Sequence, residues 1–170
     1  PRFALSLLSV FACASSALSA PAFEAVEGDV APLEVGCRLF SNRDFTALAV
    51  PDALAGARFI RTDIEAEQTL TCTQPGTIYA ITPAEHPENS LAADLRAQGF
   101  EQLPAEPFQL FGRTENDRAL VFRKAFANGE KLATRKWIIL AAHGDLRLTH
   151  VPDPVRLAAR HTDWRTNDGE

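Results

Sequence analysis

The chain has 170 residues, of which 46% are hydrophobic, and its formal net charge is −5. This length predicts a single domain that can bury a sizeable hydrophobic core. The chain is mildly acidic and contains no block of lysine and arginine residues. We therefore expect neither nucleic acid nor an anionic membrane surface as a partner held by electrostatic attraction.

Residues 1–20 are predicted to be an export signal. Arg2 supplies a positive charge, residues 3–11 form an apolar run, and small residues follow, which is the order found in secretory signal peptides. The apolar run is too short to span a bilayer. The protein is therefore expected to be secreted or periplasmic. Lipid attachment at Cys13 is an alternative route to the cell surface, and a buried N-terminal helix is a third interpretation.

Export would leave two cysteines, Cys37 and Cys72, in an oxidising compartment. Because cysteines in such a compartment are usually paired, we predict a disulfide between them. The bond would close a loop of about 35 residues and stabilise the fold by about 3–4 kcal/mol. Two buried free thiols are the alternative.

The first elements after the signal are predicted from alternation and from turn residues. Residues 21–32 are polar and bounded by prolines, so we expect a flexible lead-in. A strand is predicted at residues 33–40, where apolar residues occupy every second position. The sequence SNRD at residues 41–44 predicts a turn. Residues 52–56 are predicted to form a tight turn or a single helical turn.

The rest of the chain is predicted to form further strands around one helix. The helix is expected to begin at Asn89 or Ser90 and to end at Gly99, with Leu91 and Leu95 on one face. The phenylalanines of residues 119–127 would also suit a helix, but the turn sequences on either side favour a strand. The predicted strands are at residues 57–62, 64–73, 77–82, 108–113, 119–127, 137–142 and 146–151.

Together these elements predict a mainly β fold. About eight short strands at intervals of about 10 residues, with one short helix, are typical of an antiparallel β-sandwich or jelly roll. A mixed α+β sheet is the alternative. We assign the sandwich to residues 33–151 and predict that residues 152–170 form a C-terminal tail with a short helix.

The sequence contains none of the common catalytic or metal-binding motifs. There is no G-x-S-x-G, no H-E-x-x-H, no cysteine pair at metal spacing and no glycine-rich phosphate loop. We therefore predict no catalytic residues, no metal site and no cofactor. The least favoured alternative is a small hydrolase that uses His143, Asp145 and His150, which flank one candidate hairpin. Solvated loop histidines explain the same pattern more simply.

Aromatic and polar side chains indicate binding more strongly than catalysis. An exposed tryptophan or tyrosine ring is a flat surface on which the CH face of a sugar can pack, while polar neighbours bond the hydroxyls. Core packing is the alternative role for rings that lie inside apolar strands. The predicted ligand-binding residues are Asn42, Arg43, Asp44, Tyr79, Trp137 and Trp164.

Several short segments form a recognisable pattern between residues 35 and 142. They are FSNRDF at residues 40–45, VPDALAG at 50–56, RFIRT at 58–62, GTIY at 76–79 and LRAQGF at 95–100. The pattern resembles a module appended to secreted bacterial polysaccharide-active enzymes, such as sulfatases and glycoside hydrolases. This resemblance implies an accessory β-sandwich domain rather than a catalytic domain, and it supplies no catalytic residues.

We therefore predict a secreted, non-catalytic β-sandwich module that binds carbohydrate or another cell-surface ligand. The alternative is a protein–protein interaction domain of the periplasm or cell surface, which would expose an apolar patch. No nucleic acid partner and no membrane span are expected.

Overall fold

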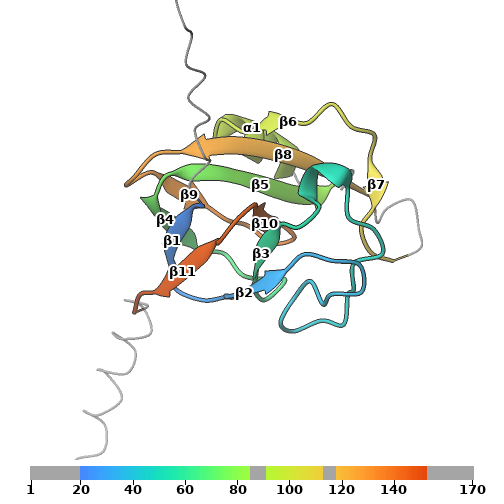
Figure 1. Ribbon diagram of the computed structural model, residues 1–170, viewed down its shortest axis with the longest axis horizontal. Helices are drawn as coiled ribbons and strands as arrows, with labels where there is room; N and C mark the ends of the chain where they lie inside the picture. The colour runs from blue at the N-terminus through green and yellow to red at the C-terminus, as the bar shows by residue number, and fades with distance from the viewer. Residues whose placement is uncertain (1–19, 85–90, 113–117, 153–170) are drawn as a thin grey trace, which may run out of the picture.

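The computed structural model describes residues 20–84, 91–112 and 118–152, and these residues form two stacked β-sheets and one α-helix (Figure 1). The smaller sheet has the strand order β11–β1–β4–β9. The larger sheet has the order β2–β3–β10–β5–β8–β6, and β7 also pairs with β8. β1 runs parallel to β11, and the other pairs within the described residues are antiparallel. The predicted mainly β, antiparallel sandwich is confirmed.

The bounds of the elements are as follows. The smaller sheet consists of β1 (Ala22–Ala25), β4 (Thr69–Gln74), β9 (Lys131–Ala133) and β11 (Arg147–His150). The larger sheet consists of β2 (Asp29–Pro32), β3 (Arg58–Arg61), β5 (Gly76–Pro83), β6 (Glu101–Gln102), β7 (Phe108–Gln109), β8 (Arg118–Phe126) and β10 (Ile139–Ala142). The helix α1 spans Leu91–Ala97, and the 3-10 turn η1 spans Asp52–Leu54.

The larger sheet is buried on both faces. Because side chains alternate along a strand, Ile78 and Ala80 of β5 face the smaller sheet, and Ile81 faces the opposite way. The first core lies between the two sheets. The second core lies under residues 33–57, which cross the outer face of the larger sheet as an irregular layer. Burial on both faces explains why β5 and β10 are almost continuously apolar.

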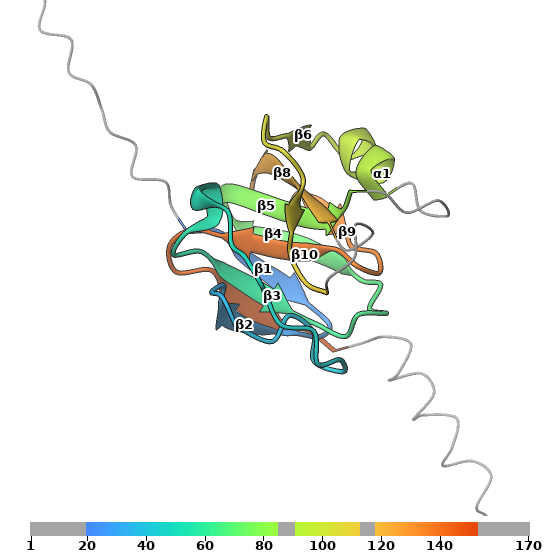
Figure 2. The ribbon, with the colours of Figure 1, turned by 90° about the vertical axis from the view of Figure 1, so that its right-hand side faces the viewer.

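The helix α1 lies beside β5 and β6, at one side of the sandwich (Figure 2). Leu91 and Leu95 are both buried in the first core, as their spacing predicts. Gly99 has a φ of +84°, so it ends the helix in the left-handed conformation that glycine adopts most readily. Within the described residues, no helix is long and apolar enough to cross a membrane.

The predicted strand at residues 33–40 is wrong. Only an isolated bridge between Arg38 and Thr46 is present there. The alternation breaks because Gly36 has a φ of +86° and Val35 is 66% exposed. The apolar residues of this segment, among them Leu39, pack instead onto the outer face of the larger sheet.

The predicted flexible lead-in at residues 21–32 is also wrong, because this segment contains β1 and β2. β1 lies between β11 and β4 in the smaller sheet, and Phe23 and Ala25 are fully buried in the first core. A four-residue strand carries too weak a pattern to be recognised alone. Its partners, residues 69–74 and 147–150, are distant in sequence and supply the hydrogen bonds that order it.

The remaining strand predictions differ from the structure mainly in length. Those at residues 57–62, 77–82, 119–127 and 146–151 correspond to β3, β5, β8 and β11. Those at residues 64–73, 108–113 and 137–142 correspond to the shorter strands β4, β7 and β10. Neither β6 nor β9 was predicted. The predicted helical turn after Pro51 is η1. Three predictions fall outside the described residues. They are the export signal apart from residue 20, the start of the helix, and the C-terminal tail with its helix apart from residue 152.

The predicted disulfide is contradicted, because Cys37 and Cys72 are both free. Cys72 is buried between the sheets, and its Sγ lies 3.2 Å from the carbonyl oxygen of Gln74. Cys37 packs against the second core, on the other side of the larger sheet. The prediction was based on compartment and cysteine count, and neither of these determines on which face of a sheet a side chain lies.

Candidate functional site

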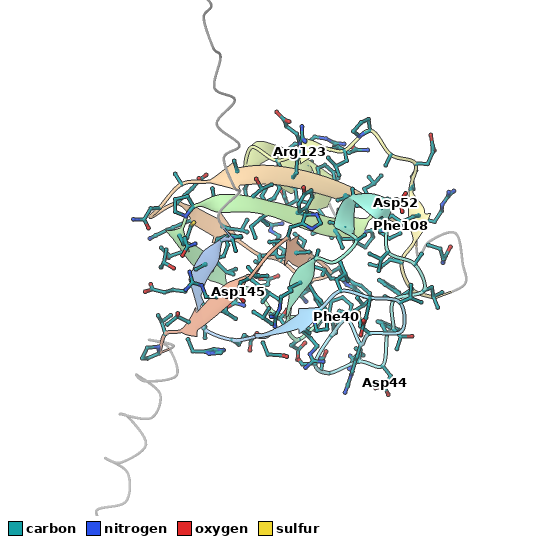
Figure 3. All side chains as sticks on the ribbon, in the orientation of Figure 1. Phe40, Asp44, Asp52, Phe108, Arg123 and Asp145 are labelled. Carbon is teal, nitrogen blue, oxygen red and sulfur yellow. The ribbon has the colours of Figure 1, made fainter. Side chains whose placement is uncertain are left out.

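The irregular layer formed by residues 33–57 covers only part of the outer face of the larger sheet. Beyond it, Tyr79 of β5 lies directly opposite Arg123 of β8, and Thr77 lies opposite Ala125. A cleft of about 490 Å³ opens here, within the range of roughly 300–1,000 Å³ typical of small-molecule sites. Arg123 marks its position on β8 in Figure 3. The cleft is lined by Thr77, Tyr79, Gly99, Glu101, Arg123, Lys124 and Ala125.

Tyr79 is half-buried in the cleft and is held in place from one side. The ring of His143 meets it edge-on, with 5.5 Å between ring centroids and an interplanar angle of 85°. His143 is fixed in turn, because its Nε2 lies 2.9 Å from the carbonyl oxygen of Ala53 in η1. A carbonyl oxygen only accepts hydrogen bonds, so Nε2 carries the proton. The Tyr79 ring is therefore preorganised by the layer beside it.

Arg123 and Glu101 form the polar side of the cleft. Their closest charged atoms, Arg123 Nη2 and Glu101 Oε2, are 3.8 Å apart, and the two side chains are 56% and 78% exposed. This separation is too long for a hydrogen bond, and an exposed ion pair of this kind contributes at most about 1 kcal/mol. Both groups therefore keep most of their capacity to donate to or accept from a ligand.

Lys124 has a structural role at the same cleft. Its Nζ lies 2.6 Å from Glu130 Oε1 and donates to the carbonyl oxygen of Gln98 at 2.6 Å. It also lies over the ring of Phe126, 4.7 Å from the centroid. The hydrogen bond from Lys124 is the largest cause that holds the pKa of Glu130 below its usual value, and the backbone N–H of Ala127 adds to it. These contacts engage the ammonium group, so Lys124 is less available to a ligand than Arg123.

The predicted polar cluster Asn42, Arg43 and Asp44 lies away from this cleft. In Figure 3, Asp44 lies at the opposite end of the molecule from Arg123. Asn42 has a structural role, because its Oδ1 accepts from the backbone N–H of Ile64 at 3.1 Å. Arg38 pairs with Asp44 at 3.3 Å and donates to the carbonyl oxygen of Arg43.

Trp137 also belongs to another part of the fold. Its ring is nearly parallel to those of Phe45 and Phe111, at interplanar angles of 27° and 22°. Phe40 meets it edge-on. Phe45 directly follows Asp44, so the predicted loop and Trp137 are neighbours, but most of the aromatic surface is used in packing. Of the three predicted aromatic residues, Tyr79 lies in the cleft, Trp137 does not, and Trp164 lies outside the described residues.

The three residues of the hydrolase alternative do not converge. His143 bonds to Ala53, whereas His150 Nε2 lies 2.7 Å from the carbonyl oxygen of Gly28. Asp145 lies 3.9 Å from Arg58. Among the described residues, no group of three or more histidine, cysteine, aspartate and glutamate side chains could hold a metal ion. The three side chains thus have three separate structural partners.

The protein-partner alternative finds little support in the described part of the chain. Large exposed hydrophobic side chains there are limited to Val35, which is 66% exposed, and Leu48, which is 48% exposed. Two such residues are ordinary for a protein surface.

Sequence reasoning missed Thr77, Glu101 and Arg123. Glu101 and Arg123 face each other only because β6 pairs with β8, and a two-residue strand such as β6 has no recognisable pattern. The alternation around Tyr79 was a usable signal, since Ile78 and Ala80 on either side mark the opposite face as core.

Comparisons with known proteins identify the fold. No family model matches the chain, and no curated protein matches it in sequence. A solved GH138 enzyme targeting pectin rhamnogalacturonan II is similar over 74% of this chain, with a TM-score of 0.51 and 18% identity. A β-glucuronidase from glycoside hydrolase family 2 is similar over 69%, with a TM-score of 0.50 and 11% identity. The chain spans 16% and 13% of these two proteins. At such identities the likeness shows a shared β fold.

Proposed function

We propose that this chain is a non-catalytic β-sandwich module that binds carbohydrate in the cleft at Tyr79, Glu101 and Arg123. The observation that carries the proposal is a half-buried tyrosine ring beside an arginine and a carboxylate that are too far apart to satisfy each other. A pyranose places its CH face on such a ring. Its hydroxyls, which both donate and accept, then bond to the guanidinium and the carboxylate.

The similar solved structures support this class of ligand. Both are carbohydrate-active enzymes by name, and in each the likeness covers a small part of a much longer chain. The resemblance of the sequence to an accessory module of polysaccharide-active enzymes points in the same direction.

The composition of the cleft supports binding rather than hydrolysis. Most glycosidases use two carboxyl groups on opposite sides of the scissile bond. Glu101 is the one carboxylate among the residues that line the cleft. Its neighbours Arg123 and Thr77 can position a sugar but cannot replace the second carboxyl group.

The test is retention of the purified protein in native gels that contain soluble polysaccharides, followed by titration with oligosaccharides of the one that retains it. Tyr79→Ala and Arg123→Ala are each expected to weaken binding about tenfold or more, because each removes a central contact. Arg43→Ala is the matched control, since it removes an exposed arginine far from the cleft. Equal retention of Tyr79→Ala and wild type, or no retention on any polysaccharide, would refute the proposal.

We also propose that the protein is secreted or periplasmic. Residues 1–20 support this through their charged start and apolar run. Fused to a periplasm-dependent reporter enzyme, these residues are expected to give full reporter activity. Replacing two leucines of the apolar run by arginine should abolish it. Activity that survives this change would contradict export by this segment.

A further inference from the structure

Strand register places the main side chains of the Tyr79 cleft in a single row. Tyr79 of β5 pairs with Arg123 of β8, and Arg123 pairs with Glu101 of β6. Residues directly opposite one another on neighbouring strands project from the same face of the sheet. An aromatic ring, a cation and a carboxylate therefore stand side by side on three strands that lie about 4.8 Å apart. β6 is an edge of the larger sheet, so the carboxylate end of the row lies toward solvent.

The next row on the same face forms the floor of the cleft. It consists of Thr77 and Ala125, which pair with each other and carry small side chains. The row on the other side of Tyr79 consists of Ile81 and Val121, and both are buried in the second core. The open space therefore lies over the small residues, and the row that contains Tyr79 forms its wall.

The charges around this space cancel one another. The charged residues that line the cleft are Glu101, Arg123 and Lys124. The ammonium group of Lys124 is neutralised by Glu130, whose Oε1 lies 2.6 Å away. This leaves the guanidinium of Arg123 and the carboxylate of Glu101 to face a ligand, with 3.8 Å between their closest charged atoms. A ligand that approaches one of these charges therefore also meets the other.

This arrangement disfavours a charged sugar. A uronic acid that places its carboxylate on Arg123 brings it beside the carboxylate of Glu101, and like charges at such a distance repel each other. An amino sugar meets the opposite problem, because an ammonium group at Glu101 lies beside Arg123. A hydroxyl group meets neither problem, since it can accept a hydrogen bond from an arginine and donate one to a carboxylate.

We propose that the cleft selects an uncharged sugar with two neighbouring free hydroxyls. One hydroxyl accepts a hydrogen bond from Arg123, and the other donates a hydrogen bond to Glu101. Each bond involves a charged group, so both are stronger than bonds between neutral partners. The sugar ring packs on Tyr79, above the small residues of the floor. This inference rests on the carbohydrate function proposed above and names the class of sugar.

Native gels with matched polysaccharides test the class of sugar. The neutral probes are galactomannan and xyloglucan. The acidic probes are polygalacturonate and alginate, each used also in a carboxyl-reduced form in which the uronic acids have become neutral sugars. We expect retention on a neutral polymer, and stronger retention on the reduced form of any acidic polymer that binds. Raising sodium chloride from about 50 mM to about 500 mM should change the affinity less than about twofold, because an uncharged ligand forms no ion pair that salt can screen.

Glu101→Gln tests the carboxylate directly, because the sign of its effect depends on the ligand. For an uncharged sugar it should weaken binding about five- to tenfold, since the acceptor loses its charge. For a uronic acid the same change would strengthen binding, since a like charge is removed. Glu101 is exposed and its ion pair is weak, so the fold should tolerate the change. Glu106→Gln is the matched control, because Glu106 is exposed and does not line the cleft.

The outcomes separate this inference from the proposed function. Stronger binding by Glu101→Gln would overturn the inference, and so would retention on an acidic polymer that weakens or stays unchanged after carboxyl reduction. Either result leaves a carbohydrate function that depends on Tyr79 standing. Unchanged binding by Glu101→Gln would show that the carboxylate does not contact the ligand, and would also overturn the inference. Absence of retention on every polymer would refute the proposed function itself, and the inference with it.

Discussion

Replacing Lys124 by methionine tests the contacts that hold β8 to the end of α1 and to the turn before β9. Its ammonium group lies 2.6 Å from Glu130 Oε1, donates to Gln98, and lies over Phe126. The side chains of Lys124 and Glu130 are 19% and 32% exposed. Methionine keeps the apolar stem of the side chain but removes the charge and the donors.

The expected loss follows from these contacts. A hydrogen bond that involves a charged group contributes roughly 1.5–3 kcal/mol, and a cation–π contact about 0.5–1 kcal/mol. Removing the ammonium also removes the cost of keeping it partly buried, which offsets part of the loss. We expect Lys124→Met to lower the free energy of unfolding by about 2 kcal/mol. For a domain of this size, this corresponds to a melting temperature lower by about 4–8 °C.

Urea denaturation at neutral pH measures this loss, with Lys131→Met as the matched control. Lys131 is the neighbouring exposed lysine on β9, and its substitution should change the free energy of unfolding by less than about 0.5 kcal/mol. Equal stability of the two variants would refute the structural role assigned to Lys124.

The pH dependence provides a second check on the same pair. The pKa of Glu130 is lowered in the folded protein, first by the hydrogen bond from Lys124. A group with a lowered folded pKa stabilises the fold above its unfolded pKa, which for glutamate is about 4.3. This stabilisation is lost as the pH falls through the folded pKa. The stability difference between wild type and Glu130→Gln should therefore be constant near neutral pH and shrink below about pH 4.3. A difference that does not depend on pH would contradict this assignment.

Two further predictions concern the core and the cysteines. Phe23→Ala, at a buried position of β1, should lower the free energy of unfolding by about 3–5 kcal/mol in urea denaturation. A loss below about 1 kcal/mol would mean that β1 is a flexible segment not packed in the core. Burial raises the pKa of the Cys72 thiol, so this thiol should react slowly while the protein is folded. In a Cys13→Ser variant, a thiol reagent should therefore label Cys37 in the folded protein and Cys72 only after unfolding. Absence of labelling of both cysteines in unfolded protein before reduction would instead reveal a disulfide.

The local sequence pattern was sufficient to predict a strand or helix where the segment itself contains the residues that favour it. The β-branched and apolar run around Tyr79 predicted β5, and the paired leucines before Gly99 predicted α1. The turns on both sides of residues 118–126 correctly decided in favour of a strand, although Phe122 and Phe126 lie at helical spacing. The mainly β fold class followed from these segments together.

Tertiary structure decided the conformation of the other segments, because it determines which apolar surfaces and strand edges are available for packing and pairing. The short β1 and β2 exist through pairing with strands distant in sequence. Residues 33–57 alternate like a strand at first, yet the outer face of the larger sheet offers them an apolar surface to cover. They pack there without joining either sheet as a strand. The same layer leaves the face around Tyr79 open.

The candidate site was likewise predicted only in part from the sequence. The sequence alone identified Tyr79 as an aromatic residue that could hold a ligand. That Glu101 and Arg123 stand beside it depends on the register between β6, β8 and β5. The predicted disulfide was wrong for a related reason, since Cys37 and Cys72 lie on opposite sides of one sheet. Residue type determines what a side chain can do chemically, whereas strand register and sheet face determine which side chains meet.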